Sequence, residues 1–358
     1  MMKEIARKID RGERLSPEDA LFLFEEGDLL GLGELASKVN GAKSGDRVYY
    51  NVNRHINPTN ICVNRCKFCA FSRSEGEEGA YLYTLDEVME RAAEAAEQGA
   101  TELHLVGGLH PTLSLDWYLE AIKKVKVSYP GIHVKGFTAV EIDHFAKISD
   151  ADVKDVLKRL MKAGLGSMPG GGAEILAEEN RAKICPEKIS GARWLEIMEV
   201  AHGLGLKTNA TMLYGHVESY ADRVEHMRLL REVQDRTGGF QVFIPLAFQP
   251  TGSEIAKGAQ TTGFDDLKVL SIARLFLDNF DHVKGYWVML GEKIAQLSLA
   301  FGVDDLDGTV VEEKIAHDAG ATSRSSMTRE RIEALIREAG KTPVERDSLY
   351  NIVGEGTG

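Results

Sequence analysis

Short apolar or β-branched runs alternate with longer segments of helical periodicity along most of this chain, and this alternation limits the possible folds more than any other feature. Strands that are separated by helices favour right-handed βαβ units and a parallel sheet. We therefore predict an α/β protein with a (β/α)8 barrel of TIM type, closed or nearly so, and keep an open doubly wound sheet as the alternative. Seven runs have the character of strands, namely residues 46–52, 101–108, 132–140, 164–172, 207–216, 240–248 and 282–290.

The segments between these runs carry the signals that start and stop helices. Thr84 is predicted to be an N-cap with Glu87 at the capping-box position, and Gly99 follows as a stop signal. Residues 149–164 repeat this pattern, from a serine to a glycine. These helices are expected to connect successive parallel strands.

The two ends of the chain differ from the middle, and we predict that they are additions to one compact unit. Residues 1–45 are expected to form an N-terminal cap of two short helices, the first with Ser16 as N-cap and Pro17 at its first position. Residues 46–325 are expected to form the barrel. Residues 326–358 are expected to add a last helix and an extended tail.

Composition and charge exclude several classes of function. A chain of 358 residues that is 43% hydrophobic and 27% charged can bury a large core. Its formal net charge of −12 argues against a nucleic-acid partner, which would favour a basic surface. The chain has neither a long apolar run nor an apolar N-terminus, so we expect no membrane association and a cytoplasmic location. Its four cysteines are too few for a disulfide framework, and clustered thiols favour metal or redox chemistry.

Three of the four cysteines lie in the stretch "NPTNICVNRCKFCAFSR", where Cys62, Cys66 and Cys69 form the pattern CxxxCxxC. Structural zinc sites and iron–sulfur electron carriers usually have four protein ligands. Three thiolates leave one metal position open for a substrate or cofactor. The spacing therefore indicates a [4Fe-4S] cluster with one iron reserved for chemistry, and Cys185 is expected to take no part. An electron carrier and a structural zinc protein remain the alternatives.

Polar and glycine-rich segments follow the other predicted strands in the same way. Active sites of (β/α)8 barrels are built from the loops at the carboxyl ends of the strands. These segments are therefore expected to face one opening together with the cysteines. They are residues 107–111, Glu141, residues 169–174, residues 214–218 and residues 248–252.

The CxxxCxxC motif after the first strand resembles the signature of the radical S-adenosylmethionine (SAM) superfamily. In that family SAM binds the unique iron of a [4Fe-4S] cluster and is cleaved reductively to a 5′-deoxyadenosyl radical. The resemblance implies that Phe68, before the third cysteine, packs near the adenine and that Gly107 and Gly108 meet the SAM amino group through their backbone. It also implies that Glu174 binds the ribose and that Glu218 belongs to the segment contacting the adenine.

Longer segments extend the resemblance over nearly the whole chain. "SMPGGGAEIL", "TNATMLYGHVES" and "VERDSLY" are similar to the aminofutalosine synthases of the futalosine route to menaquinone. This implies a transferase that adds the adenosyl radical to the double bond of 3-[(1-carboxyvinyl)oxy]benzoate, with loss of the carboxyl group. It also implies an electron donor such as flavodoxin or ferredoxin. The dehypoxanthine futalosine cyclases, which use the radical to abstract hydrogen, are the alternative.

The substrate implied by this resemblance carries two carboxylates, so cationic or amide donors are expected at the barrel mouth. The candidates for catalytic side chains are His216, Arg54 and His55. Further candidates for substrate binding are Asn57, Arg181, Arg193 and Gln249.

Overall fold

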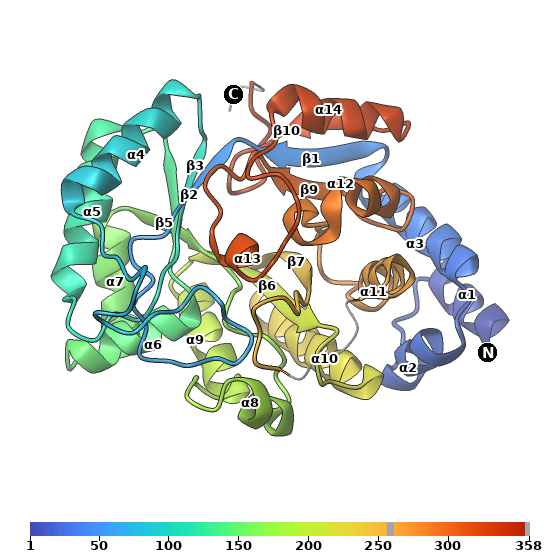
Figure 1. The fold of residues 1–358 in the computed structure, drawn as a ribbon. Helices are drawn as coiled ribbons and strands as arrows, with labels where there is room; N and C mark the ends of the chain where they lie inside the picture. Colours follow the sequence, from blue (N-terminus) through green and yellow to red (C-terminus); the bar gives the residue numbers. More distant parts are fainter. Residues whose placement is uncertain (256–260, 355–358) are drawn as a thin grey trace.

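The computed structural model describes residues 1–255 and 261–354, and its centre is a curled parallel sheet of seven strands (Figure 1). The strands follow one another in sheet order as they do in the chain, so each βα unit adds one strand beside the last. Their carboxyl ends therefore lie at one edge of the sheet. The strands are β2 (Asn53–Ile56), β3 (Glu102–Leu105), β4 (His133–Gly136), β5 (Leu165–Met168), β6 (Lys207–Tyr214), β7 (Phe240–Ala247) and β8 (His282–Val283).

Helices surround this sheet, and the short helix α13 lies in front of its centre in Figure 1. Their inner faces bury the apolar residues that alternate with charged ones along each helix, which is the pattern expected of helices packed on a sheet. The helices are α1 (Met2–Asp10), α2 (Pro17–Glu26), α3 (Leu29–Ser44), α4 (Leu85–Glu97), α5 (Leu115–Ser128), α6 (Ala139–Ile148), α7 (Val153–Ala163), α8 (Glu178–Ile184), α9 (Gly191–Gly203), α10 (Tyr220–Thr237), α11 (Gly263–Phe276), α12 (Trp287–Ser298), α13 (Ile315–Asp318) and α14 (Arg329–Glu338).

A second, three-stranded parallel sheet lies beside the first in the order β10–β1–β9. Its strands are β1 (Arg47–Asn51), β9 (Asp305–Gly308) and β10 (Thr342–Glu345). Isolated bridges join Lys284 to Asp305 and Arg54 to Val311, so the segment around β9 connects the two edges of the seven-stranded sheet. The predicted α/β barrel is confirmed, as a curled partial barrel that this segment completes.

Two of the predicted strand runs differ from the observed elements. The run at 46–52 is mostly β1 of the small sheet, and the first barrel strand is β2, which follows directly. The run at 282–290 contains only two strand residues before α12 begins at Trp287. Its apolar letters belong to a buried helix, and a short apolar run cannot be told from a strand by periodicity alone.

Two predictions about the helices differ from the structure: the N-terminal cap contains three helices, α1 to α3, rather than two, and one helix starts later than predicted. The capping box of Thr84 and Glu87 is present, and Ser16 caps α2. Helix α7 begins after Asp152 rather than after Ser149, because the Asp152 carboxylate accepts the N–H group of the third helical residue. Local capping chemistry therefore positions these helix starts.

The N-terminal helices and the C-terminal segment both pack against the barrel. Helices α2 and α3 contact α10 and α11, while α14 contacts β9 and β10. The division of the chain at residues 45 and 325 stays a prediction, and residues 355–358 of the predicted tail lie outside the described residues. Within the part of the chain that is described, no helix combines the length and apolar character needed to cross a membrane.

Candidate active site

The loop after β2 carries the three clustered cysteines. Cys62, Cys66 and Cys69 all line one cavity of about 240 Å³, which we name the outer cavity. Hydrogen bonds between backbone groups hold this loop: Val63 N–H donates to Leu109 O at 3.0 Å, and Cys69 N–H donates to Cys66 O at 2.9 Å. The three thiols are thus presented to one space by a single supported loop.

The donor set fits a thiolate-bound metal cluster. Burial raises the pKa of Cys62 and raises that of Cys66 to about 12, so these groups are neutral thiols until a metal replaces the proton. Cys185 is buried and lines neither the outer cavity nor the inner cavity described below. Among the described residues, no three His, Cys, Asp or Glu side chains are arranged so that they could hold a single metal ion.

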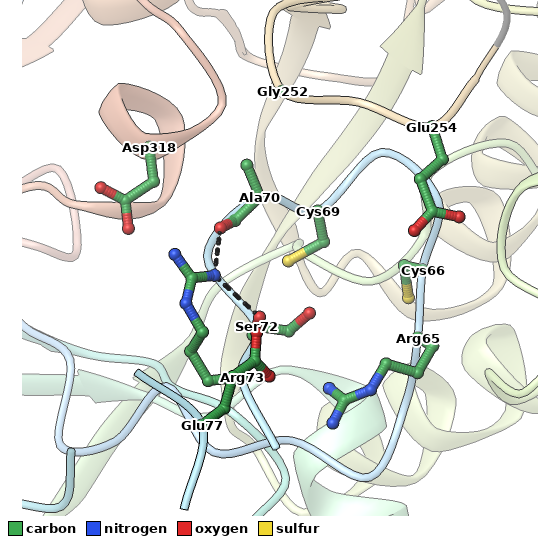
Figure 2. A pocket seen from close by; sticks show the side chains of 10 residues that line it. All are labelled: Arg65, Cys66, Cys69, Ala70, Ser72, Arg73, Glu77, Gly252, Glu254 and Asp318. Carbon is green, nitrogen blue, oxygen red and sulfur yellow. Dashed lines mark hydrogen bonds between the residues drawn. The ribbon is translucent and has the colours of Figure 1, made fainter. Parts of the chain in front are cut away.

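The cysteine loop separates the outer cavity from a surface hollow of about 510 Å³. Cys66 and Cys69 line both spaces. Figure 2 shows Arg73 in this hollow, where its guanidinium donates to the Ala70 carbonyl at 2.7 Å and to the Ser72 carbonyl at 2.9 Å. A group held by the cysteines would therefore lie within one loop's thickness of the protein surface.

The predicted glycine pair packs against the cysteine loop. Gly107 N–H donates to Glu141 Oε1 at 3.0 Å, and Gly108 N–H donates to Thr59 O at 2.8 Å. A Cβ atom at Gly108 would lie 2.3 Å from the Ile61 carbonyl oxygen, so only glycine allows this approach. Both glycines line the outer cavity.

Glu141 is the third residue of α6 and forms a capping box with Thr138. Its carboxylate accepts the Thr138 N–H at 2.7 Å and also lines the outer cavity. Burial raises the pKa of Glu141 to about 7, while the N–H groups of Thr138 and Gly107 act in the opposite direction. The side chain thus ties the α6 N-terminus to the glycine pair.

Phe68 and Glu174 meet around a lysine that the sequence analysis did not single out. Lys188 Nζ lies 2.5 Å from Glu174 Oε1 and 5.0 Å from the centroid of the Phe68 ring, and all three residues line the outer cavity. Burial disfavours the charged form of Lys188, but the neighbouring Cys66 and Glu174 side chains hold its pKa above the ordinary value. Glu174 has a φ of 47°, a left-handed conformation that is costly for a non-glycine residue.

His216 and Glu218 lie in the turn after β6 and line neither cavity. The Glu218 carboxylate accepts the N–H groups of Gly215 at 2.6 Å and of His216 at 2.9 Å. His216 Nε2 bonds the Leu213 carbonyl at 3.0 Å, and burial lowers the pKa of this ring. The described contacts of both side chains are those of a supported turn.

Arg54 and His55 are neighbours on β2 with different surroundings. The Arg54 guanidinium pairs with Glu94 at 2.5 Å and with Glu312 at 3.0 Å, and it lines neither cavity. His55 lines a second cavity of about 170 Å³, which we name the inner cavity. Alternation along the strand accounts for the difference, since successive side chains point to opposite faces.

The inner cavity adjoins the outer cavity within the barrel. Polar and charged side chains reach the inner cavity from several strands and from the segments around β9 and α13: His55, Asn57, Glu102, His104, Lys135, Asn209, Lys284, Asp307 and Glu313. The residues that line both cavities are Val106, Thr138, Gly171, Leu246, Met289 and Ile315.

The further candidates for substrate binding also divide between these spaces and the surface. Asn57 lines the inner cavity, and Gln249 lines the outer one. The Arg181 guanidinium donates to the backbone carbonyls of residues 172, 173, 175 and 189, so it supports the glycine-rich loop after β5. Arg193 pairs with Asp143 at 2.9 Å.

The structure adds three lysines to the candidate site: Lys135 and Lys284, which are buried, and Lys188, which is partly buried. Two of them left a signal in the sequence, because Lys135 and Lys284 interrupt otherwise apolar strand runs. A buried lysine requires a partner or a ligand. Lys188 had no such signal, since its segment after α8 resembles an ordinary loop.

Comparison with known proteins identifies the class of protein that this fold and site define. The family model of the radical SAM superfamily matches residues 56–230, and the model of the CofH/MqnC C-terminal region matches residues 237–355. The hydrogenase maturase HydG from Carboxydothermus hydrogenoformans has a similar fold, with a TM-score of 0.75 and 17% identity over 98% of this chain and 80% of that one. This chain belongs to the radical SAM superfamily of enzymes.

Within the superfamily, the chain belongs to the group with the CofH/MqnC C-terminal region. It is 49% identical to the aminodeoxyfutalosine synthase of Thermus thermophilus, over 98% of this chain and 95% of the relative. It is 45% identical to a 5-amino-6-(D-ribitylamino)uracil–L-tyrosine 4-hydroxyphenyl transferase of Methanopyrus kandleri, over 86% and 85%. It is 40% identical to the cyclic dehypoxanthine futalosine synthase of Streptomyces coelicolor, over 98% and 88%.

Proposed function

We propose that this chain is an aminodeoxyfutalosine synthase of menaquinone biosynthesis. The reaction adds the 5′-deoxyadenosyl group of SAM to the double bond of 3-[(1-carboxyvinyl)oxy]benzoate, with loss of the carboxyl group. The observation that carries this proposal is the 49% identity to a synthase over nearly the full length of both chains. The predicted barrel, the cysteine loop and the two adjoining cavities are consistent with two substrates bound side by side.

The outer cavity is the proposed site of a [4Fe-4S] cluster and SAM. When bound, this pair would supply the 5′-deoxyadenosyl radical. Cys62, Cys66 and Cys69 would hold the cluster as thiolates. The N–H groups of Gly107 and Gly108 already have acceptors, and an ammonium group is itself a donor, so these residues would contact the SAM ammonium group through their carbonyl oxygens.

Phe68 and Glu174 are the proposed contacts of the adenosine part of SAM. Both line the outer cavity, and Lys188 holds the Glu174 carboxylate in place at 2.5 Å. Glu218 stays a predicted contact without support from the described geometry, because it caps the turn after β6. Because only Glu174 lines the outer cavity, mutating Glu174 and Glu218 one at a time can show which carboxylate contacts SAM.

The proposal also includes catalytic roles for side chains of the barrel and an external electron donor. His55 is supported by its place in the inner cavity, whereas no described contact supports Arg54 or His216 as catalytic residues. A flavodoxin or ferredoxin is the proposed reductant. The surface hollow that reaches Cys66 and Cys69 supports a short path for the electron.

The enzyme's walls must also protect a reactive radical from water and from unwanted C–H bonds. The outer cavity is lined mainly by apolar side chains such as Phe71, Leu213 and Phe248. Ile315 of α13 lies on both cavities, so the segment that carries α13 covers the space between them. Such enclosure excludes water from the reacting groups.

A labelled-substrate assay tests the proposal. Reconstituted enzyme is incubated anaerobically with dithionite, SAM labelled in the adenosine and 3-[(1-carboxyvinyl)oxy]benzoate, and the products are identified by mass spectrometry. Parallel incubations replace the enolpyruvyl benzoate with dehypoxanthine futalosine, or with L-tyrosine and 5-amino-6-(D-ribitylamino)uracil. We expect the label in aminodeoxyfutalosine and no turnover of dehypoxanthine futalosine. Label found only in free 5′-deoxyadenosine, together with a cyclised product, would assign the chain to the cyclases instead. An adduct of tyrosine would assign it to the 4-hydroxyphenyl transferases.

A further inference from the structure

Two polar atoms in the wall of the inner cavity have no hydrogen-bond partner among the described residues. They are His55 Nε2 and Asn57 Oδ1, and both side chains are more than nine-tenths buried. The Asn57 amide nitrogen donates to Val106 O at 2.7 Å, so its oxygen is the atom left unpaired. Buried polar atoms in native proteins nearly always have partners, so this wall of the cavity is suited to a polar ligand.

Three of the charged groups of the inner cavity are already compensated, namely Lys135, Glu102 and Glu313. Lys135 Nζ lies 2.6 Å from Glu102 Oε2, and the same carboxylate oxygen accepts the Ser348 hydroxyl at 2.7 Å. Glu313 accepts the Ala316 N–H at 2.9 Å and pairs with His317 at 3.1 Å. Each of these charges is balanced by a close partner at 2.6–3.1 Å.

Lys284 is less closely paired than Lys135. Its ammonium nitrogen lies 3.2 Å from Asp307 Oδ1 and 3.7 Å from Asp305 Oδ1, although the side chain is only 2% exposed. Asp305 is mainly engaged elsewhere, because its Oδ2 accepts from Arg346 at 2.7 Å and from the Tyr350 hydroxyl at 2.8 Å. A buried ammonium with three donors, whose nearest carboxylate oxygen lies at 3.2 Å, keeps donors available to an anionic ligand.

The remaining walls and the size of the inner cavity suit an aromatic ring. Val106, Ile244, Leu246 and Met289 line it with apolar atoms. Its volume of about 170 Å³ compares with the cavity of about 150 Å³ that admits benzene in another protein. The cavity thus combines apolar walls, one available cation, and the unpaired atoms of His55 on β2 and of Asn57 just after it.

We infer that the inner cavity binds an aromatic carboxylate, with the Lys284 ammonium paired to the carboxylate and His55 Nε2 bonded to a second oxygen of the ligand. This inference rests on the proposed function and deepens it, since it assigns the benzoate end of the substrate to the inner cavity. The enolpyruvyl end then points along the shared wall at Leu246 and Met289 toward the outer cavity. Lys284 is in this scheme a specificity-determining residue for the substrate.

The test measures a preference rather than an activity. Calorimetry gives the dissociation constants of 3-hydroxybenzoate and of its neutral isostere 3-hydroxybenzamide for the reconstituted enzyme. A charge-assisted pair should make the carboxylate bind about 10- to 100-fold more tightly than the amide. Lys284→Met should abolish this preference, and Lys284→Arg should retain part of it. The matched control is Lys38→Met, which removes an exposed lysine paired with Asp10 and should leave the preference unchanged.

A second measurement on the unaltered chain covers the case in which Lys284→Met does not fold. Saturating 3-hydroxybenzoate should slow the reductive methylation of Lys284 severalfold while leaving Lys38 unaffected, as read by peptide mass spectrometry. Equal methylation of Lys284 with and without the ligand would overturn the inference, as would an unchanged preference in a folded Lys284→Met variant.

The outcomes also separate this inference from the proposed function. Wild-type enzyme that converts the enolpyruvyl benzoate but shows no role for Lys284 contradicts the inference alone. Wild-type enzyme that binds neither aromatic ligand and forms no aminodeoxyfutalosine contradicts both.

Discussion

The outer and inner cavities share a wall but are built in different ways. The outer cavity takes its reactive groups from one loop, with Cys62, Cys66 and Cys69 within eight residues, and backbone hydrogen bonds hold that loop. The inner cavity takes its charges from strands far apart in the chain. Residues near the C-terminus support these groups: Ser348 donates to Glu102, and Arg346 pairs with Asp305 beside Lys284. Cofactor chemistry is therefore local in the sequence, whereas recognition of the second substrate depends on the whole fold. Related chains can accordingly keep the first region while the second changes.

The largest expected effect is the loss of cluster binding at the outer cavity, with the inner cavity unchanged. Replacing Cys62, Cys66 or Cys69 by Ala should abolish cluster assembly and all SAM cleavage, because each thiolate supplies one of three protein ligands. Cys185→Ala should keep its iron, since this thiol lines neither cavity. Iron content and the visible spectrum are measured after anaerobic reconstitution of the cysteine-loop variants and of Cys185→Ala. Loss of the cluster in a folded Cys185→Ala protein would contradict the three-thiolate site.

The next largest effect is a loss of folding stability when the buried charge network beside the inner cavity is disrupted. Arg346→Met leaves the buried Asp305 carboxylate without its closest cation, which should lower the free energy of unfolding by about 3–5 kcal/mol. Arg337→Met removes an exposed pair with Glu333 and should cost less than about 1 kcal/mol. Urea unfolding followed by circular dichroism compares the two variants. Equal losses of unfolding free energy in the two variants would show that the buried pair of Arg346 and Asp305 does not stabilise the fold.

A smaller effect sharpens the assignment of the outer cavity. Glu174→Gln should weaken SAM binding by about tenfold, the order expected for a charged hydrogen bond, without reducing iron content. Glu218→Gln should leave SAM affinity unchanged, because that carboxylate caps the turn after β6. SAM affinity is measured on reconstituted protein of known iron content. A weakened affinity in Glu218→Gln alone would reverse the two assignments.

The smallest effect concerns the segment that covers both cavities. The hydrogen bond to Glu313 raises the pKa of His317 to about 9, above its ordinary value near 6.5. The folded state therefore holds the proton more tightly, so this stabilisation is complete below about pH 6.5 and is lost as the pH rises through 9. Because the ring is partly exposed, the loss should stay below about 1 kcal/mol. His317→Asn should flatten the pH dependence of urea unfolding over this interval, and an unchanged slope would contradict the prediction.

Much of the architecture could be predicted because its causes are local. The alternation of strand and helix patterns led to an α/β barrel, and the capping box at Thr84 placed the start of α4. The extra strand β1 and the true first barrel strand β2 could not be separated, because they form one continuous run in the sequence and differ only in their partners. For the same reason, the start of α12 was predicted to be part of a strand.

The candidate site shows the same limit at the level of single residues. Arg54 and His55 are adjacent on β2 and looked equally suitable, yet only His55 lines a cavity. Lys284 interrupts an apolar run, which signals a buried charge, but its looser pairing depends on Arg346 holding Asp305. No spacing rule connects residues so distant in the chain.

The sequence by itself determined the radical SAM cysteine motif, the glycine pair and the parallel α/β character, because each of these depends on residues a few positions apart. Only the tertiary structure decided which side chains line the inner cavity, which buried acids are already satisfied and which lysine remains available. The physical reason is that a buried charge is stable only with its partners, and the folded chain brings those partners together from opposite ends of the sequence.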